Sequence, residues 1–84
     1  MANVVSIITE TTKKLVKSDG TEVKVGDYCI FQTRSSGIVH GTYRGINASG
    51  HLIFEELLGG NIYETRVLPK SILIFEVANE VKRG

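Results

Sequence analysis

The segment "GTYRGINASGHLIFEE", residues 41–56, decides the fold of this 84-residue chain. Apolar side chains recur along both of its halves, and Asn47 and Gly50 between them favour turn geometry. In the second half Leu52 and Phe54 point to one face of an extended strand, because successive side chains alternate between faces. The segment therefore predicts two β-strands joined by a turn that Asn47 begins and Gly50 closes.

The rest of the chain continues this pattern of short strands and turns. Nine glycines, one proline and many β-branched residues are typical of strands separated by frequent turns. Gly41 and Gly45 are expected to let the longest strand bend. The predicted fold class is therefore mainly β, a small, strongly bent SH3-like barrel of about five strands. We expect strands over residues 28–34, 38–46, 51–57, 62–67 and 72–77, with a flexible loop at 57–61 and a tight connection at 68–71.

A separate hairpin is predicted for "LVKSDGTEVKV", residues 15–25. Asp19 and Gly20 are the residue types that a two-residue type I′ turn prefers, because both must adopt positive φ. Such a turn would place Val16 directly opposite Val23, so that an apolar cross-strand pair fixes the register.

The two ends of the chain are less sharply defined by their sequence. Residues 3–14 are rich in Val, Ile and Thr, which favours an extra N-terminal strand, but a short leading helix also fits so brief a segment. We expect a single domain over residues 1–84, with the barrel core at about 24–77 and a polar tail at 78–84.

Composition excludes several classes of site. Ten basic and nine acidic residues leave a net charge of +1. Many nucleic-acid-binding proteins have a much larger positive charge, which attracts phosphate groups. A symmetric oligomer can nevertheless bring one lysine per subunit to a single pore. Cys29 stands alone and no metal-ligand spacing is present, so we expect no disulfide within the chain, no metal and no cofactor. The lack of a long apolar run predicts a cytoplasmic protein without a membrane segment.

The last expected strand is apolar on both faces. A barrel core covers only one face, so the other is expected to meet a neighbouring subunit, because exposed apolar edges mark interaction sites. The alternative is that "VVSII", residues 4–8, folds over this outer face. The residues assigned to the subunit interface are Ile72, Leu73, Ile74 and Phe75.

Two segments together resemble the signatures of the Sm/LSm/Hfq family. In "GTYRGINASGHLIF" the glycine and apolar positions of the first signature are met, although Asn47 stands for the usual Asp and His51 for the usual Asn. "RVLPKSILIF" is similar to the second signature, with Pro69-Lys70 at its basic turn. The resemblance covers about residues 24–77. The matching positions of the first signature are Gly41, Tyr43, Ile46, Leu52 and Phe54.

This resemblance implies a homo-oligomeric ring that binds single-stranded RNA and acts in RNA metabolism. Carried over residue by residue, the RNA-binding candidates are Asn47, Ser49, His51 and Lys70. Ser49 departs from the aromatic residue usual at the stacking position, and stacking contributes roughly 1–3 kcal/mol per base, so weak binding is expected unless His51 stacks instead. Ordinary roles stay open: Asn47 as a turn residue, His51 as an exposed side chain and Lys70 as a solvated turn lysine.

The first segment also resembles the small non-catalytic barrel at the C-terminus of biotin protein ligases. That comparison implies the same architecture but a different function, a protein-interaction or scaffold module that binds no nucleic acid. A viral or mobile-element origin would suit so compact a domain.

Catalysis has little support in the sequence. No nucleophile elbow or phosphate-binding glycine loop occurs, and adjacent Glu55 and Glu56 face opposite sides of a strand. We expect no enzyme and no catalytic residues. Cys29 is expected to pack as a small apolar group, with a Cys29–His pair as the remaining alternative.

Overall fold

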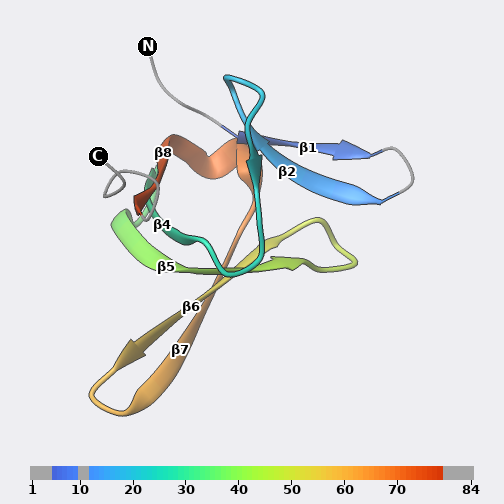
Figure 1. The fold of residues 1–84 in the computed structure, drawn as a ribbon. Coiled ribbons are helices and arrows are strands. Elements are labelled where there is room, and N and C mark those ends of the chain that lie inside the picture. The colour runs from blue at the N-terminus through green and yellow to red at the C-terminus, as the bar shows by residue number, and fades with distance from the viewer. Residues whose placement is uncertain (1–4, 10–11, 79–84) are drawn as a thin grey trace.

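The fold is mainly β, as the sequence predicts, and consists of two antiparallel sheets (Figure 1). It was obtained as a computed structural model that describes residues 5–9 and 12–78, so most of the predicted polar tail lies outside the described residues. One sheet has the order β1-β2-β3 and the other β7-β6-β5-β4-β8. The elements are β1 (Val5–Thr9), β2 (Lys13–Lys17), β3 (Glu22–Val23), β4 (Tyr28–Thr33), β5 (Gly37–Ile46), β6 (Leu52–Leu58), β7 (Asn61–Val67), the 3-10 turn η1 (Pro69–Ser71) and β8 (Ile72–Val77).

The five-stranded sheet bends at β5, its longest strand. A Cβ atom on Gly41 would lie 2.9 Å from Cβ of Phe54, so only glycine lets β6 approach this closely. Three residues further on, Arg44 is an extra residue between the pairs Tyr43–Phe54 and Gly45–Ile53, which makes a β-bulge. A bulge increases the local twist and bends the strand. The curved sheet wraps one core but does not close into a complete hydrogen-bonded barrel.

The core lies on the inner face of this bend and centres on aromatic rings. Phe54 has ring centroids of Phe31, Tyr43 and Phe75 within 4.6, 5.6 and 6.2 Å. The three-stranded sheet contributes further apolar side chains, which join the same cluster. The buried core residues are Val5, Leu15, Val23, Cys29, Phe31, Tyr43, Leu52, Phe54, Ile72, Phe75 and Val77.

The N-terminal segment is a strand, which decides between the two alternatives left by the sequence. Within β1, Val5 is buried and Ile7 packs against the core, while the strand pairs with β2. The described part of "VVSII" thus lies on the core side. It does not cover the outer face of β8, where Ile74 stays 46% exposed.

A second bulge explains why β8 is apolar at four successive positions. Thr33 pairs with Ile72 and Gln32 with Ile74, so Leu73 is the extra residue. Because the bulge interrupts strict alternation, Ile72 and Phe75 both face the core, although they are three residues apart. The apolar excess therefore belongs partly to the chain's own core.

The predicted register of the β2–β3 hairpin is wrong by one residue. Leu15, not Val16, pairs with Val23, and the amide of Gly20 donates to the carbonyl of Lys17 at 2.8 Å. No described residue other than glycine has positive φ, so Asp19 cannot take its part in a type I′ turn. The side chain of Asp19 instead accepts the amide of Thr21 at 2.9 Å, and the loop has three residues.

The expected flexible loop at residues 57–61 is a tight turn. Strand pairing continues without a break from Leu52–Val67 to Leu58–Asn61, and only Gly59 and Gly60 lie between the strands. Their φ values of 58° and 85° suit a type I′ turn, which glycine pairs favour. The hairpin β6–β7 consequently forms a long arm that projects from the body (Figure 1). Within the described residues, no helix has the length and apolar character needed to cross a membrane.

Replacing Gly41 by alanine tests the close approach at the bend. We expect Gly41→Ala to lower the free energy of unfolding by about 1–3 kcal/mol, because the added methyl group forces β6 away from β5. Urea denaturation followed by circular dichroism measures this. Ser36→Ala, in an exposed turn, serves as the control and should change stability by less than about 0.5 kcal/mol. Equal stabilities of the two variants would contradict the packing role of Gly41.

Burial gives Tyr43 an abnormal titration. Desolvation, followed by the smaller effects of Cys29 and Glu22, raises the pKa of Tyr43 from 10.0 to about 12. In the unfolded chain this hydroxyl loses its proton near pH 10, whereas the folded chain retains it to about pH 12. The free energy of unfolding should therefore fall as the pH rises from 10.0 to about 12. Below pH 10.0 the contribution of the Tyr43 hydroxyl to stability is fully present. Tyr43→Phe should show a shallower decline in urea denaturations across the window; parallel declines would contradict the assignment.

Candidate nucleic-acid interface

Three connections surround an open hollow of about 290 Å³. They are the β4–β5 turn, the β5–β6 turn and the connection through η1. The two turns lie at opposite ends of β5, and the η1 connection runs from one of these ends to the other, so it is the bend of the sheet that brings all three around one hollow. The residues that line the hollow are Thr33, Ser35, Ser36, Val39, His51, Thr65, Arg66, Val67, Leu68 and Ser71.

Asn47 holds the β5–β6 turn together. Its side-chain oxygen Oδ1 accepts the amides of Ser49 at 3.0 Å and His51 at 2.9 Å. Its own amide donates to the carbonyl of His51 at 3.0 Å, and its carbonyl accepts the amide of Gly50 at 3.0 Å. The oxygen that would bond a base edge is therefore already engaged by two backbone donors. An aspartate could accept the same two bonds, since the geometry needs only an oxygen at this position.

The turn that carries Lys70 is tied to the β4–β5 turn. The amide of Arg34 donates to the carbonyl of Ser71 at 3.0 Å, and its Nε lies 3.5 Å from the carbonyl of Lys70. The side chain of Lys70 is exposed. It lies beside the hollow, because the next residue, Ser71, is one of the lining residues. Arg34 and Lys70 thus add two cationic side chains next to residues that line the hollow.

The chemistry of the hollow suits an anion. Five lining residues carry hydroxyl groups, Arg66 and His51 add donors, and no lining residue is a carboxylate. Arg66 Nε contacts Glu64 Oε2, which partly neutralises it, but a guanidinium offers five donors and retains others for a ligand. His51 is the only ring-bearing residue in the lining, so a stacked base would have to use it.

The four predicted RNA-binding residues differ in where they lie relative to the hollow. His51 lines the hollow and Lys70 follows it closely in space through Ser71, whereas Asn47 supports the turn, and Ser49 is exposed and is not a lining residue. The sequence did not single out Arg66, because the strand that carries it shows only an alternation of polar and apolar residues. The sequence also missed the hydroxyl groups of the "RSSG" segment, which carried only a turn signal. No local pattern marks these residues, because three separate segments bring them together.

The four residues predicted for the subunit interface also differ, in how far their side chains are exposed. Ile72 and Phe75 are 3% and 0% exposed and pack within their own chain, so their side chains cannot meet a neighbour. Leu73 is half-buried and Ile74 is 46% exposed. Since β8 is an edge strand, its backbone and the side chain of Ile74 remain accessible to a second subunit.

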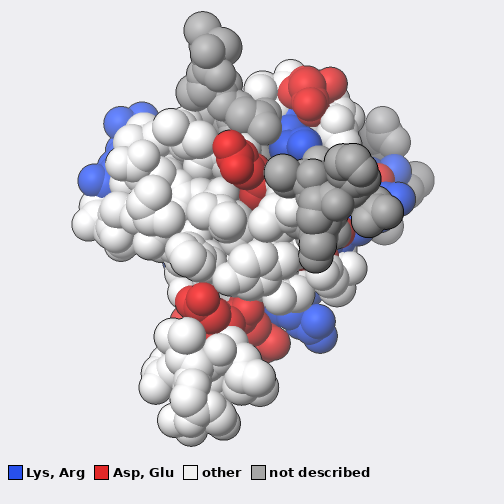
Figure 2. Space-filling view, turned by 60° about the vertical axis from the view of Figure 1, so that its left-hand side comes forward, with Lys and Arg blue, Asp and Glu red and all other residues white. Residues whose placement is uncertain are grey.

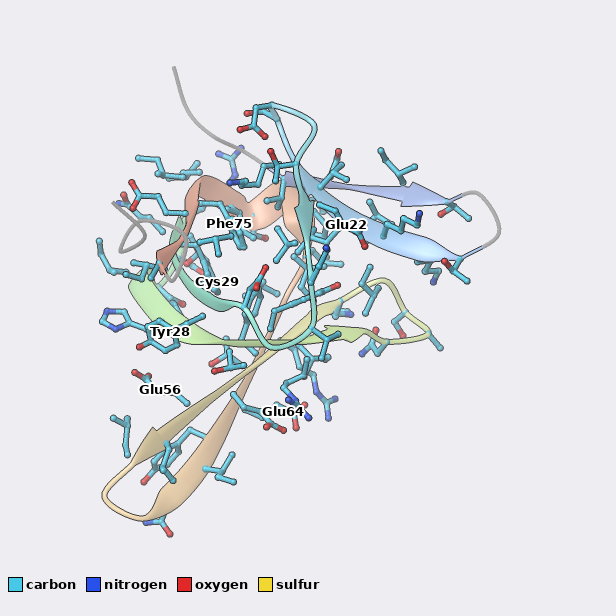
Figure 3. All side chains as sticks on the ribbon, in the orientation of Figure 1. Glu22, Tyr28, Cys29, Glu56, Glu64 and Phe75 are labelled. Carbon is cyan, nitrogen blue, oxygen red and sulfur yellow. The ribbon has the colours of Figure 1, made fainter. Side chains whose placement is uncertain are left out.

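A second polar cluster lies on the outer face, where the arm leaves the body. The Tyr28 hydroxyl lies 3.5 Å from Glu56 Oε2 and 3.4 Å from His40 Nδ1, and Nδ1 lies 3.8 Å from the same carboxylate oxygen (Figure 3). Burial, and then the Glu56 charge, raises the pKa of Tyr28 and keeps its hydroxyl protonated as a donor. These contacts link β4, β5 and β6, so the cluster braces the base of the arm.

Cys29 lies in the core with 0% exposure, which keeps its thiol away from any substrate in solution. His40 pairs across the strands with Ile30 and so faces the side opposite to Cys29. Of the two histidines with which a reactive Cys29–His pair could form, the sheet therefore excludes His40. Among residues 5–9 and 12–78 no group of three or more potential metal ligands occurs.

No protein-family model, curated protein or solved structure matches this chain.

Replacing Asn47 separates turn support from ligand binding. Asn47→Ala should lower the free energy of unfolding by about 1–3 kcal/mol, because it leaves the part-buried His51 amide without its acceptor. Asn47→Asp keeps an acceptor oxygen and should lose less than about 0.5 kcal/mol. Both are measured by urea denaturation. If Asn47→Ala proves as stable as the parent chain, the two side-chain hydrogen bonds contribute nothing to the turn.

Proposed function

We propose that this chain is an oligomeric, Sm-like barrel that binds single-stranded RNA in the hollow between its three connections. The observation that supports this most is the composition of the hollow: His51, Arg66 and five hydroxyl groups, with Arg34 and Lys70 alongside and no lining carboxylate. Donors concentrated in this way suit phosphate and sugar oxygens, which make up much of any contact with nucleic acid.

Each group has a distinct part in the proposed binding. Arg66 and Lys70 contact phosphates, the serine and threonine hydroxyls bond sugar or base edges, and His51 stacks on a base. Asn47 acts indirectly, because its oxygen fixes the turn that carries His51. With only the small imidazole ring of His51 to stack on a base, each subunit binds weakly, and several subunits must contribute to one strand.

A second candidate function is a protein-interaction module without nucleic-acid binding. A specific feature favours it, because the tip of the β6–β7 arm exposes four large apolar side chains. Exposed apolar patches of this kind mark sites of contact with other proteins. The net charge of +1 also fits this alternative. The two functions differ in whether the hollow or the arm contacts the partner.

Titration of labelled single-stranded RNA at several salt concentrations tests the proposed site. Lys70→Ala and Arg66→Ala should each weaken binding several-fold and reduce the slope of log K against log salt by about 0.7, the loss of one phosphate contact on a single strand. His51→Ala should weaken binding with little change of slope, because stacking involves no counterion release.

Lys13→Ala is the matched control, since this exposed lysine lies on β2 in the other sheet. It should bind as the parent chain does. If the three hollow variants bind RNA as tightly as the control, or if the parent chain binds none, the RNA-binding proposal fails and the protein-interaction module gains support.

A further inference from the structure

The arm tip, residues 57–63, exposes apolar side chains on both faces of its hairpin. Strand pairing places Leu57 and Ile62 on one face, and Leu58 and Tyr63 lie on the other. Their exposed fractions are 68%, 67%, 52% and 53%, in the order named. At about 200 Å² for a fully exposed residue of this size, the four present roughly 500 Å² of surface. An exposed apolar patch of this extent marks a site that contacts a protein or a membrane.

The boundary between uncharged and charged residues runs across the arm. None of residues 57–63 carries a charge. The next pair toward the body is Glu56–Tyr63, and the one after it is Glu55–Glu64, so both strands become acidic at nearly the same distance from the end. Figure 2 shows the tip as an uncharged end below the acidic residues at the base of the arm. A hairpin that lay flat on a partner would instead have one apolar and one polar face along its length.

An occupant of the arm tip has to cover both faces and the end at once. A protein surface against which the hairpin lies covers one face and leaves the other in water. The apolar groove between β4, β5 and β8 of a second copy has a volume of about 230 Å³. Because a cavity of about 150 Å³ holds one benzene molecule, that groove has room for the side chains of one face at most. The interfacial layer of a lipid bilayer, in contrast, surrounds an inserted element on every side.

The length of the arm tip matches the depth of that interfacial layer. From the Glu56–Tyr63 pair the chain runs three residues to Gly59, about 10 Å at about 3.3 Å per residue. Interfacial elements bury their apolar side chains about 5–10 Å into the boundary between headgroups and acyl chains. At this depth the outward N–H and C=O groups of the two strands still reach water, which the centre of a bilayer lacks. Tyr63 lies at the top of the tip, where an amphipathic ring meets the headgroups.

The charges at the base of the arm partly cancel. Arg44 Nε lies 3.6 Å from Glu55 Oε1, and Arg66 Nε contacts Glu64 Oε2. Anionic lipids attract clusters of unpaired basic side chains, and the base of the arm does not present one. The lipid surface that suits this arm is therefore zwitterionic.

The arm holds its tip ready for insertion. Its strands are paired continuously from Leu52–Val67 to Leu58–Asn61, and the Tyr28–His40–Glu56 cluster braces the base. The tip therefore projects from the body as a fixed element (Figure 1). Such a preformed element loses little conformational entropy when it binds.

We propose that the arm tip inserts its four apolar side chains into the interface of a zwitterionic lipid bilayer and so attaches this chain to a membrane surface. This inference goes beyond RNA binding, since none of the residues that line the hollow belongs to the tip. It accounts for an apolar surface on both faces of one hairpin and for the charge boundary that crosses it.

Flotation with phosphatidylcholine vesicles tests the attachment. At millimolar lipid the parent chain should float with the vesicles. Replacing part of the lipid by phosphatidylserine, or raising the salt concentration, should change binding by less than about twofold, because few charges are involved.

Variants of the two faces test whether lipid surrounds the tip. Leu57→Gln/Ile62→Thr alters one face and Leu58→Gln/Tyr63→Thr the other, and each should weaken vesicle binding at least about tenfold. Val25→Thr is the matched control, because Val25 is 60% exposed but lies outside the arm. It should bind as the parent chain does. Far-ultraviolet circular dichroism confirms that each variant is folded.

A single tryptophan then reports the depth of the tip. The chain contains no tryptophan, so in Ile62→Trp all indole fluorescence comes from the arm. Its emission should shift to shorter wavelength when vesicles are added, and lipids brominated on their acyl chains should quench it. Val25→Trp should show neither effect.

Three results would overturn the membrane proposal. The first is a parent chain that does not float with vesicles. The second is a loss of binding in the variant of one face alone, which would indicate a protein that covers that face. The third is binding that requires phosphatidylserine and is unchanged in both tip variants, which would assign the contact to basic side chains elsewhere.

RNA binding at the hollow is measured separately from flotation. Lys70→Ala should weaken RNA binding and leave flotation unchanged. If the chain floats but binds no RNA, the membrane inference stands while the proposed function fails; RNA binding without flotation leads to the reverse conclusion.

Discussion

The packing of Phe54 against its aromatic neighbours is the contact on which the rest of the structure depends. Phe54 lies on β6, and its ring contacts Phe31 on β4, Tyr43 on β5 and Phe75 on β8. One side chain therefore joins four of the five strands of the larger sheet. The contact forms because Gly41 has no side chain, which lets β6 cross close to the bend of β5.

The bend determines where the functional surfaces lie. By folding the sheet over this aromatic core, it brings the turns at the two ends of β5, together with the η1 connection, around the hollow lined by His51 and Arg66. It also directs the far end of β6 and β7 away from the body, so the arm has solvent on both faces. A polar hollow and an apolar arm thus arise at opposite ends of the same hairpin.

The hollow and the arm differ in chemistry. Hydrogen-bond donors line the hollow, whereas the arm exposes four large apolar side chains. Because Asn47 is committed to its turn, contacts in the hollow depend on residues that the turn positions and on those that η1 and the β4–β5 turn supply.

Sequence patterns by themselves determined the strands, the bend at Gly41 and the turn at Asn47, because alternation, glycine and turn chemistry act over a few residues. They did not determine the three-residue β2–β3 loop, whose register depends on how Leu15 and Val23 pack in the core, nor the bulge at Leu73 that buries both Ile72 and Phe75. The tertiary structure alone brought Arg66 to His51 and left the arm tip without a cover. Both results depend on contacts between segments far apart in the chain, which no local pattern records.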